Sequence, residues 1–98
     1  MPKTFKPAQP FAEGPRPPIA LTEIPEDRSS QIGAVGYDAA TATLAVQFRR
    51  GARAIYHYPN VSPVMHAEFM SSESLGRYFG LHIESMDFAK YPAETATA

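Results

Sequence analysis

The chain of 98 residues is 44% hydrophobic and carries nine basic and ten acidic residues, which gives a formal net charge of −1. This length suits one domain with a small core, and the near-neutral charge excludes a long-range field that would draw the protein to nucleic acid or anionic membranes. The chain has no cysteine for disulfides or thiolate metal sites and no long apolar run, so we expect a soluble cytoplasmic protein without membrane contact.

Prolines dominate the first part of the chain, where seven of the ten lie before residue 28. Each proline lacks a backbone donor and fixes φ, so this density disfavours both helix and paired strand. We therefore predict an extended or disordered arm over residues 1–27, a globular domain over residues 28–91 and a frayed tail over residues 92–98. The run Arg16-Pro17-Pro18-Ile19 has two interpretations, a plain linker or a polyproline II segment that a protein partner recognises.

Three short runs with strand-like patterns follow, over residues 30–37, 43–49 and 53–58. The middle run is the clearest, because its apolar residues alternate with polar or small ones. In the third run, Tyr56 and Tyr58 point to one face of the strand and His57 points to the other. The short links between the runs predict a three-stranded antiparallel meander.

The apolar period changes to a helical one after the third run. Ser62 can cap a helix and Pro63 suits its first turn, and apolar residues recur at every fourth position from residue 61 to residue 69. A second helical pattern, short or irregular because it contains two glycines, spans residues 75–83. We therefore predict an α+β domain in which two short helices pack on one face of the sheet.

No residue pattern indicates catalysis. The three histidines, His57, His66 and His82, are 9 and 16 residues apart, which matches no metal-binding spacing. No serine lies in a GxSxG elbow, and the acidic residues are spaced as on a solvated face. We expect no enzyme activity, no metal site and no cofactor.

Arginines and aromatic residues gather in two parts of the chain. Three arginines surround the predicted turn before Tyr56-His57-Tyr58, and Arg77 directly precedes Tyr78. Arginine binds phosphate, and aromatic rings stack on unpaired bases. The candidate nucleic-acid-binding residues are Arg49, Arg50, Arg53, His57 and Arg77. Tyr56, Tyr58 and Tyr78 have two interpretations, stacking or core, because a small domain also needs aromatic side chains in its interior.

Several segments, taken in order, resemble the KTSC family, a small domain named after the C-terminus of some lysyl-tRNA synthetases that also occurs alone in bacterial and phage proteins. The segments are Ser29-Ser30-Gln31-Ile32, Val35-Gly36-Tyr37-Asp38, Thr43–Phe48, Tyr56-His57-Tyr58 and Ser74–Phe79, with Ile83 after them. The resemblance covers residues 28–84. Its markers are the paired serines, the central YxY and the SxGxYF stretch.

The resemblance implies an RNA-binding role, which is proposed for the family because of the synthetase association. Gly80 stands where the family commonly has asparagine, and Glu84 and Asp87 follow where a more basic end is common. These departures weaken a purely electrostatic nucleic-acid surface.

Two functions therefore remain open. The first is a non-enzymatic accessory module that binds nucleic acid, RNA rather than DNA, through an arginine and aromatic patch on the sheet and hairpin tip. The alternative is a protein-interaction module, such as a bacterial or phage adaptor, that uses the proline-rich arm or an exposed strand edge.

Overall fold

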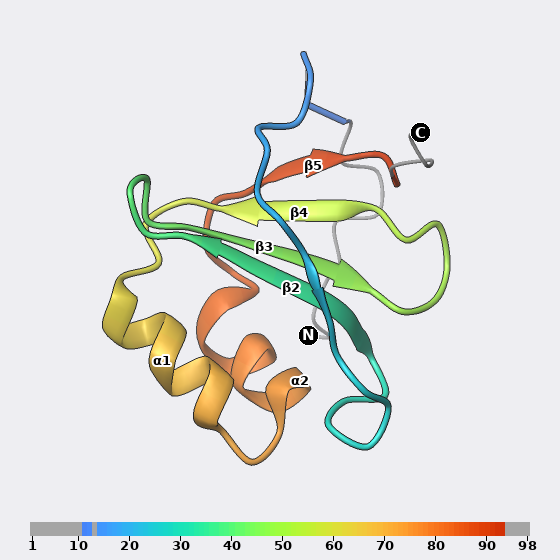
Figure 1. Cartoon of the computed structure of the whole chain (residues 1–98), viewed down its shortest axis with the longest axis vertical. Helices are drawn as coiled ribbons and strands as arrows, with labels where there is room; N and C mark the ends of the chain where they lie inside the picture. Colours follow the sequence, from blue (N-terminus) through green and yellow to red (C-terminus); the bar gives the residue numbers. More distant parts are fainter. Residues whose placement is uncertain (1–10, 13, 94–98) are drawn as a thin grey trace.

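Among the residues that the structure describes, five antiparallel strands form one sheet, in the order β1-β2-β3-β4-β5. A computed structural model describes residues 11–12 and 14–93, and Figure 1 shows the sheet with helices below it. The strands are β1 (Thr22–Glu23), β2 (Ile32–Asp38), β3 (Thr43–Phe48), β4 (Ile55–Tyr58) and β5 (Ala89–Tyr91). The broad α+β class is confirmed, but the described part of the chain forms a sheet of five strands and not the predicted three.

The three predicted runs correspond to β2, β3 and β4, which pair as a meander. In the register, Val35 lies opposite Val46, and Val46 lies opposite Tyr56. The two additional strands, β1 and β5, lie at the edges and are two and three residues long. Segments this short show no alternation, so their pairing is set by the neighbouring strand and not by their own sequence.

The helices are α1 (Pro63–Ser71), α2 (Leu75–Tyr78) and the π-helical turn η1 (Phe79–Ile83). The predicted start of α1 is confirmed, because the Ser62 hydroxyl accepts a hydrogen bond of 3.1 Å from the backbone N–H of Met65. Ser74 caps α2 in the same way through the backbone N–H of Arg77, at 3.2 Å. Among the described residues, no helix is long and apolar enough to cross a membrane.

The main core lies between the helices and one face of the sheet. Its largest fully buried side chains are Phe69, Ile32, Leu44, Leu75, Ile83, Val46 and Val61. Aromatic rings extend this core, since Phe79 contacts both Phe48 and Tyr58 edge-on at centroid distances of 5.4 and 5.5 Å. The helices are therefore held by apolar burial on alternate residues of β3 and β4.

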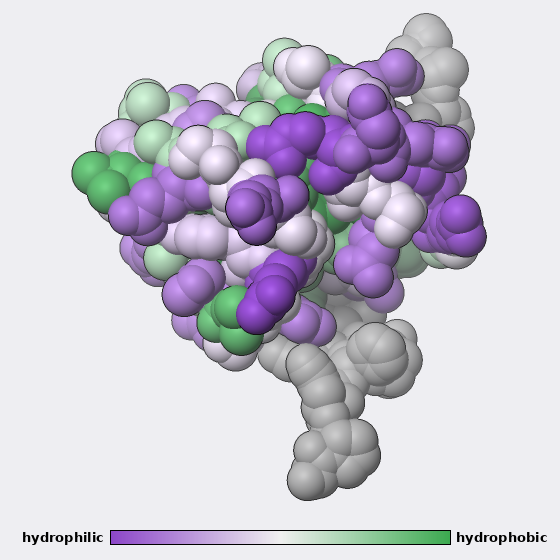
Figure 2. Space-filling view, turned by 90° about the horizontal axis from the view of Figure 1, so that it is seen from below, coloured by the Kyte–Doolittle hydropathy of each residue, from purple (hydrophilic) through white to green (hydrophobic). Residues whose placement is uncertain are grey.

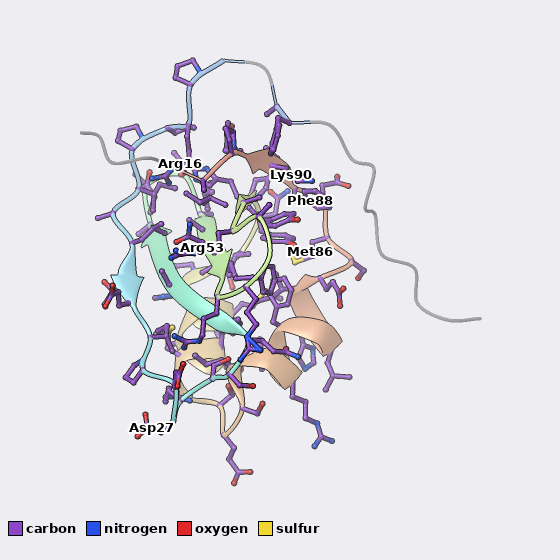
Figure 3. The ribbon with its side chains drawn as sticks, turned by 90° about the vertical axis from the view of Figure 1, so that its right-hand side faces the viewer. Arg16, Asp27, Arg53, Met86, Phe88 and Lys90 are labelled. Carbon is purple, nitrogen blue, oxygen red and sulfur yellow. The ribbon has the colours of Figure 1, made fainter. Side chains whose placement is uncertain are left out.

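The outer face of the sheet is covered by residues 14–21, which we call the strap. Figure 3 shows this segment on one side of the sheet and the helices on the other. Ile19 of the strap forms a second, smaller apolar cluster with Ala45 and Ile55. A Cβ added at Gly36 would lie only 2.1 Å from the carbonyl oxygen of Ala20, so glycine lets the strap approach the strand closely.

The predicted arm, residues 1–27, lies in part outside the described residues. Where it is described, the chain is extended and packed against the sheet, and it supplies β1. The amide of Ala12 donates to the carbonyl of Lys90 in β5 at 2.7 Å. The strap therefore crosses the outer face from the β5 edge to the β1 edge. Of the predicted tail, residues 94–98 lie outside the described residues.

Candidate functional site

The side chains of Tyr56-His57-Tyr58 alternate between the two faces of the sheet, one covered by the strap and the other by the helices. His57 lies under the strap and is only 4% exposed, with its Nε2 atom 3.0 Å from Nη1 of Arg16. Tyr58 is 2% exposed on the helix side, and Tyr56 is half-buried beside it. Burial raises the pKa of the Tyr58 hydroxyl above its ordinary value. His57 and Tyr58 are thus packed inside the molecule and not presented to a ligand.

Arg49 has a structural role at the end of β3. Its Nη2 atom lies 2.8, 2.7 and 3.0 Å from the carbonyl oxygens of Ile24, Ser29 and Ile32. The two N–H groups of Nη2 are shared among these three carbonyls, which lie at both ends of the segment from residue 24 to residue 32 and within it. Arg49 therefore joins β3 to this segment through Nη2, while its Nε atom is buried without a hydrogen-bond partner among the described residues.

Arg50 and Arg53 lie on the turn between β3 and β4, where residues 50–53 are all exposed. The backbone of Arg53 has φ 61°, an uncommon value for a residue with a side chain. The Gln47 side-chain amide donates to the Arg53 carbonyl at 2.9 Å and holds this conformation. The turn thus presents two arginines to solvent on a defined backbone.

Gln31 contacts Arg49, the residue before this turn, and lies against the first turn of α2. The amide of Arg49 donates to the Gln31 carbonyl at 2.8 Å, and a Cβ added at Gly76 would lie 2.8 Å from Gln31 Oε1. Arg50 is the residue after Arg49, and Arg77 is the residue after Gly76; both arginines are exposed. Two arginines that are distant in sequence therefore extend from segments that contact one residue.

A polar cleft of about 570 Å³ lies between residues 26–31 and residues 73–77. Its lining residues are Glu26, Asp27, Arg28, Ser29, Ser30, Gln31, Glu73, Ser74, Gly76 and Arg77. Figure 2, which views the molecule from below the helices, shows a mostly hydrophilic surface with small, separate apolar patches. Two of the segments that carry the family resemblance, the paired serines and the SxGxYF stretch, meet at this cleft.

Hydrogen bonds fix both walls of the cleft. The Ser29 hydroxyl accepts from the amides of Gln31 and Ile32, at 3.2 and 3.0 Å. Arg28 donates through Nη1 to the Ser72 carbonyl at 3.2 Å and through Nη2 to the Met70 carbonyl. These bonds hold the serine-containing loop against the end of α1, so the cleft has an ordered shape before any ligand binds.

A second hollow, of about 280 Å³, lies on the other side of Arg77. Tyr78 and His82 line it with their ring centroids 4.4 Å apart, and Leu81 beside them is 66% exposed. The Tyr78 hydroxyl donates to Glu68 Oε1 at 3.0 Å; burial and this bond raise the pKa of Tyr78. His82 was not among the predicted site residues, although its spacing of four from Tyr78 indicates one helix face.

The site therefore combines exposed arginines, a polar cleft and an aromatic pair. The acidic residues of the cleft, Glu26, Asp27 and Glu73, make its charge mixed and add hydrogen-bond acceptors. Within residues 11–12 and 14–93, no three acidic or histidine side chains converge as metal ligands. The chemistry that these groups offer is hydrogen bonding, stacking and ion pairing.

A protein-family model described as the KTSC domain matches residues 28–88. Among solved structures, the chain is similar to the crystal structure of a KTSC domain protein from Yersinia pestis, with 30% sequence identity and a TM-score of 0.63. That match covers 79% of this chain and 100% of the other chain. No curated protein matches. The family match includes the exposed arginines and leaves out the strap.

Proposed function

Because the chain belongs to the KTSC family, we propose that it is a non-enzymatic, cytoplasmic accessory module that binds single-stranded nucleic acid, RNA in preference to DNA. The observation that carries this proposal is the placement of Arg50 and Arg77 on two segments that both contact Gln31. Arg53 extends the same surface along the turn. In this proposal the three exposed guanidinium groups each contact a phosphate of the same strand.

The proposed interface differs from the sheet patch that the sequence suggests. Of the stacking candidates predicted from sequence, Tyr78 is kept, and His82 joins it in the hollow beside Arg77. A base next to a phosphate held by Arg77 would reach these rings, and base–aromatic stacking contributes about 1–3 kcal/mol per base. The interface thus runs from the β3–β4 turn, past Gln31, to η1.

The preference for RNA has a physical basis in the polar cleft. Ser30, Gln31 and the carboxylates offer donors and acceptors that suit the 2′-hydroxyl of ribose, which DNA lacks. The synthetase association of the family also motivates RNA. Because the same carboxylates repel phosphate, we expect weak, salt-sensitive binding that depends on the three arginines.

The test is the binding of a labelled single-stranded RNA and of DNA of the same sequence, followed by fluorescence anisotropy at several salt concentrations. Three phosphate contacts predict a slope of about −2 for log K against log salt. The triple variant Arg50→Ala, Arg53→Ala, Arg77→Ala should bring the slope close to zero. Ala39→Glu on the far β2–β3 turn, which also makes the net charge more negative, serves as the control. Equal binding by wild type and the triple variant would contradict the proposal.

A further inference from the structure

The strap has the contacts of a bound peptide. Pro15, Pro17 and Pro18 are exposed, whereas Ile19 is 5% exposed and packs on Ala45 and Ile55. The segment therefore touches the sheet through a few spaced side chains, as extended proline-containing ligands do in general.

The strap contributes no strand to the sheet and no side chain to the main core. The strands β2 to β5 pair with one another, and the main core lies on their other face. The strap instead joins the separate cluster around Ile55. Ile24, three residues after the strap ends, belongs to the main core. Its backbone amide donates to the Gly33 carbonyl at 2.9 Å. Departure of the strap would uncover Ala45, Ile55 and His57, but it would not break a strand pair or remove a side chain from the main core.

Two side chains define what this face accepts. Arg16 places Nη1 3.0 Å from His57 Nε2 and 3.3 Å from its own Ile19 carbonyl, which fixes an arginine over β4. Ile19, three residues later, fills the space above Ala45 and Ile55. Gly36 lets the backbone of the ligand lie directly on β2. The face thus matches an extended segment with an arginine three residues before an isoleucine.

We propose that the outer face of the sheet is a binding site for extended Arg-x-x-Ile segments of a partner protein, and that the strap occupies this site in cis. A partner that carries the pattern binds when it displaces the strap. This inference is independent of the nucleic-acid proposal, because it uses none of the exposed arginines of that interface. It gives the protein-interaction alternative a defined surface.

The test uses the full chain and a labelled peptide with the sequence of residues 14–21, measured by fluorescence anisotropy. Ile19→Ser weakens the strap in cis, and circular dichroism and thermal unfolding establish that the variant is folded. The variant should bind the peptide saturably, and wild type should bind it at least about tenfold more weakly, because the tethered strap competes at high effective concentration. A control peptide with alanine and serine in place of the arginine and isoleucine should not bind.

Two results would overturn the proposal. One is a folded Ile19→Ser variant that binds neither peptide, or binds both equally well. If Ile19→Ser does not fold, Arg16→Ala replaces it in the same assay. If both variants are unfolded, the strap is an inseparable part of the core and the site does not exist as a receptor.

Discussion

The Nη2 atom of Arg49, at the end of β3, lies 2.8 Å from the carbonyl oxygen of Ile24, the residue that follows β1. The same atom also contacts Ser29 and Ile32. Because Arg49→Ala leaves these carbonyls without their charged donor, we expect a loss of about 2–4 kcal/mol in the free energy of unfolding. Urea denaturation measures this loss. Arg50→Ala, on the exposed turn, should stay within about 0.5 kcal/mol of wild type.

A second prediction concerns the approach of the strap to β2. Gly36→Ala places a Cβ against the Ala20 carbonyl, and overpacking of this kind costs about 1–3 kcal/mol. The matched control is Gly80→Ala in η1, where the nearest atom to a Cβ is Glu84 Oε1 at 3.7 Å. That control should be neutral or stabilising by up to about 1 kcal/mol through helix propensity. Similar melting temperatures for both variants would contradict the packing of the strap.

A third prediction concerns pH. The His66 ring stacks on Tyr37 with centroids 4.2 Å apart, and burial lowers the pKa of His66 below 6.5. The unfolded chain therefore takes up this proton at a higher pH than the folded chain, so the free energy of unfolding falls as pH drops below about 6.5.

The variant His66→Phe keeps an aromatic ring beside Tyr37 and removes the titrating group. Urea denaturation at several values from pH 7.5 to pH 5 should show a smaller fall in stability for the variant than for wild type. Parallel pH profiles would show that His66 does not contribute to the pH dependence.

A fourth prediction concerns the start of α1. Ser62→Ala removes the acceptor for the Met65 amide and should lower the free energy of unfolding by about 1 kcal/mol. Ser85→Ala, at an exposed serine, should change it by less than about 0.5 kcal/mol. The measurement is the urea concentration at which each variant is half unfolded, which should be lower for Ser62→Ala than for Ser85→Ala. Equal midpoints would mean that the Ser62 cap does not stabilise the fold.

Local patterns predict the central part of this fold. The alternation in β3 and the Ser62-Pro63 helix start act over a few neighbouring residues, so they are readable from sequence. The edge strands β1 and β5 are too short to carry a period, and both form because a neighbouring strand offers its hydrogen bonds.

The site was harder to predict because it depends on which surfaces are covered. Strand alternation places the His57 side chain on one face of β4 and those of Tyr56 and Tyr58 on the other. It cannot show that the strap covers His57. Likewise, Arg49 and Arg50 are adjacent arginines before a predicted turn, so no local pattern separates a structural arginine from a ligand-binding one. Their difference in role arises from the loop at residues 24–32, whose carbonyls surround only Arg49.

The most direct test of the central claim is to map the contact surface by NMR. Backbone amide shifts of the full-length protein are followed while a single-stranded RNA is added at low salt. We predict shifts at residues 30–31, 50–53 and 76–82, and none at residues 39–42 of the far turn. Shifts confined to other surfaces, or no shifts at all, would contradict it.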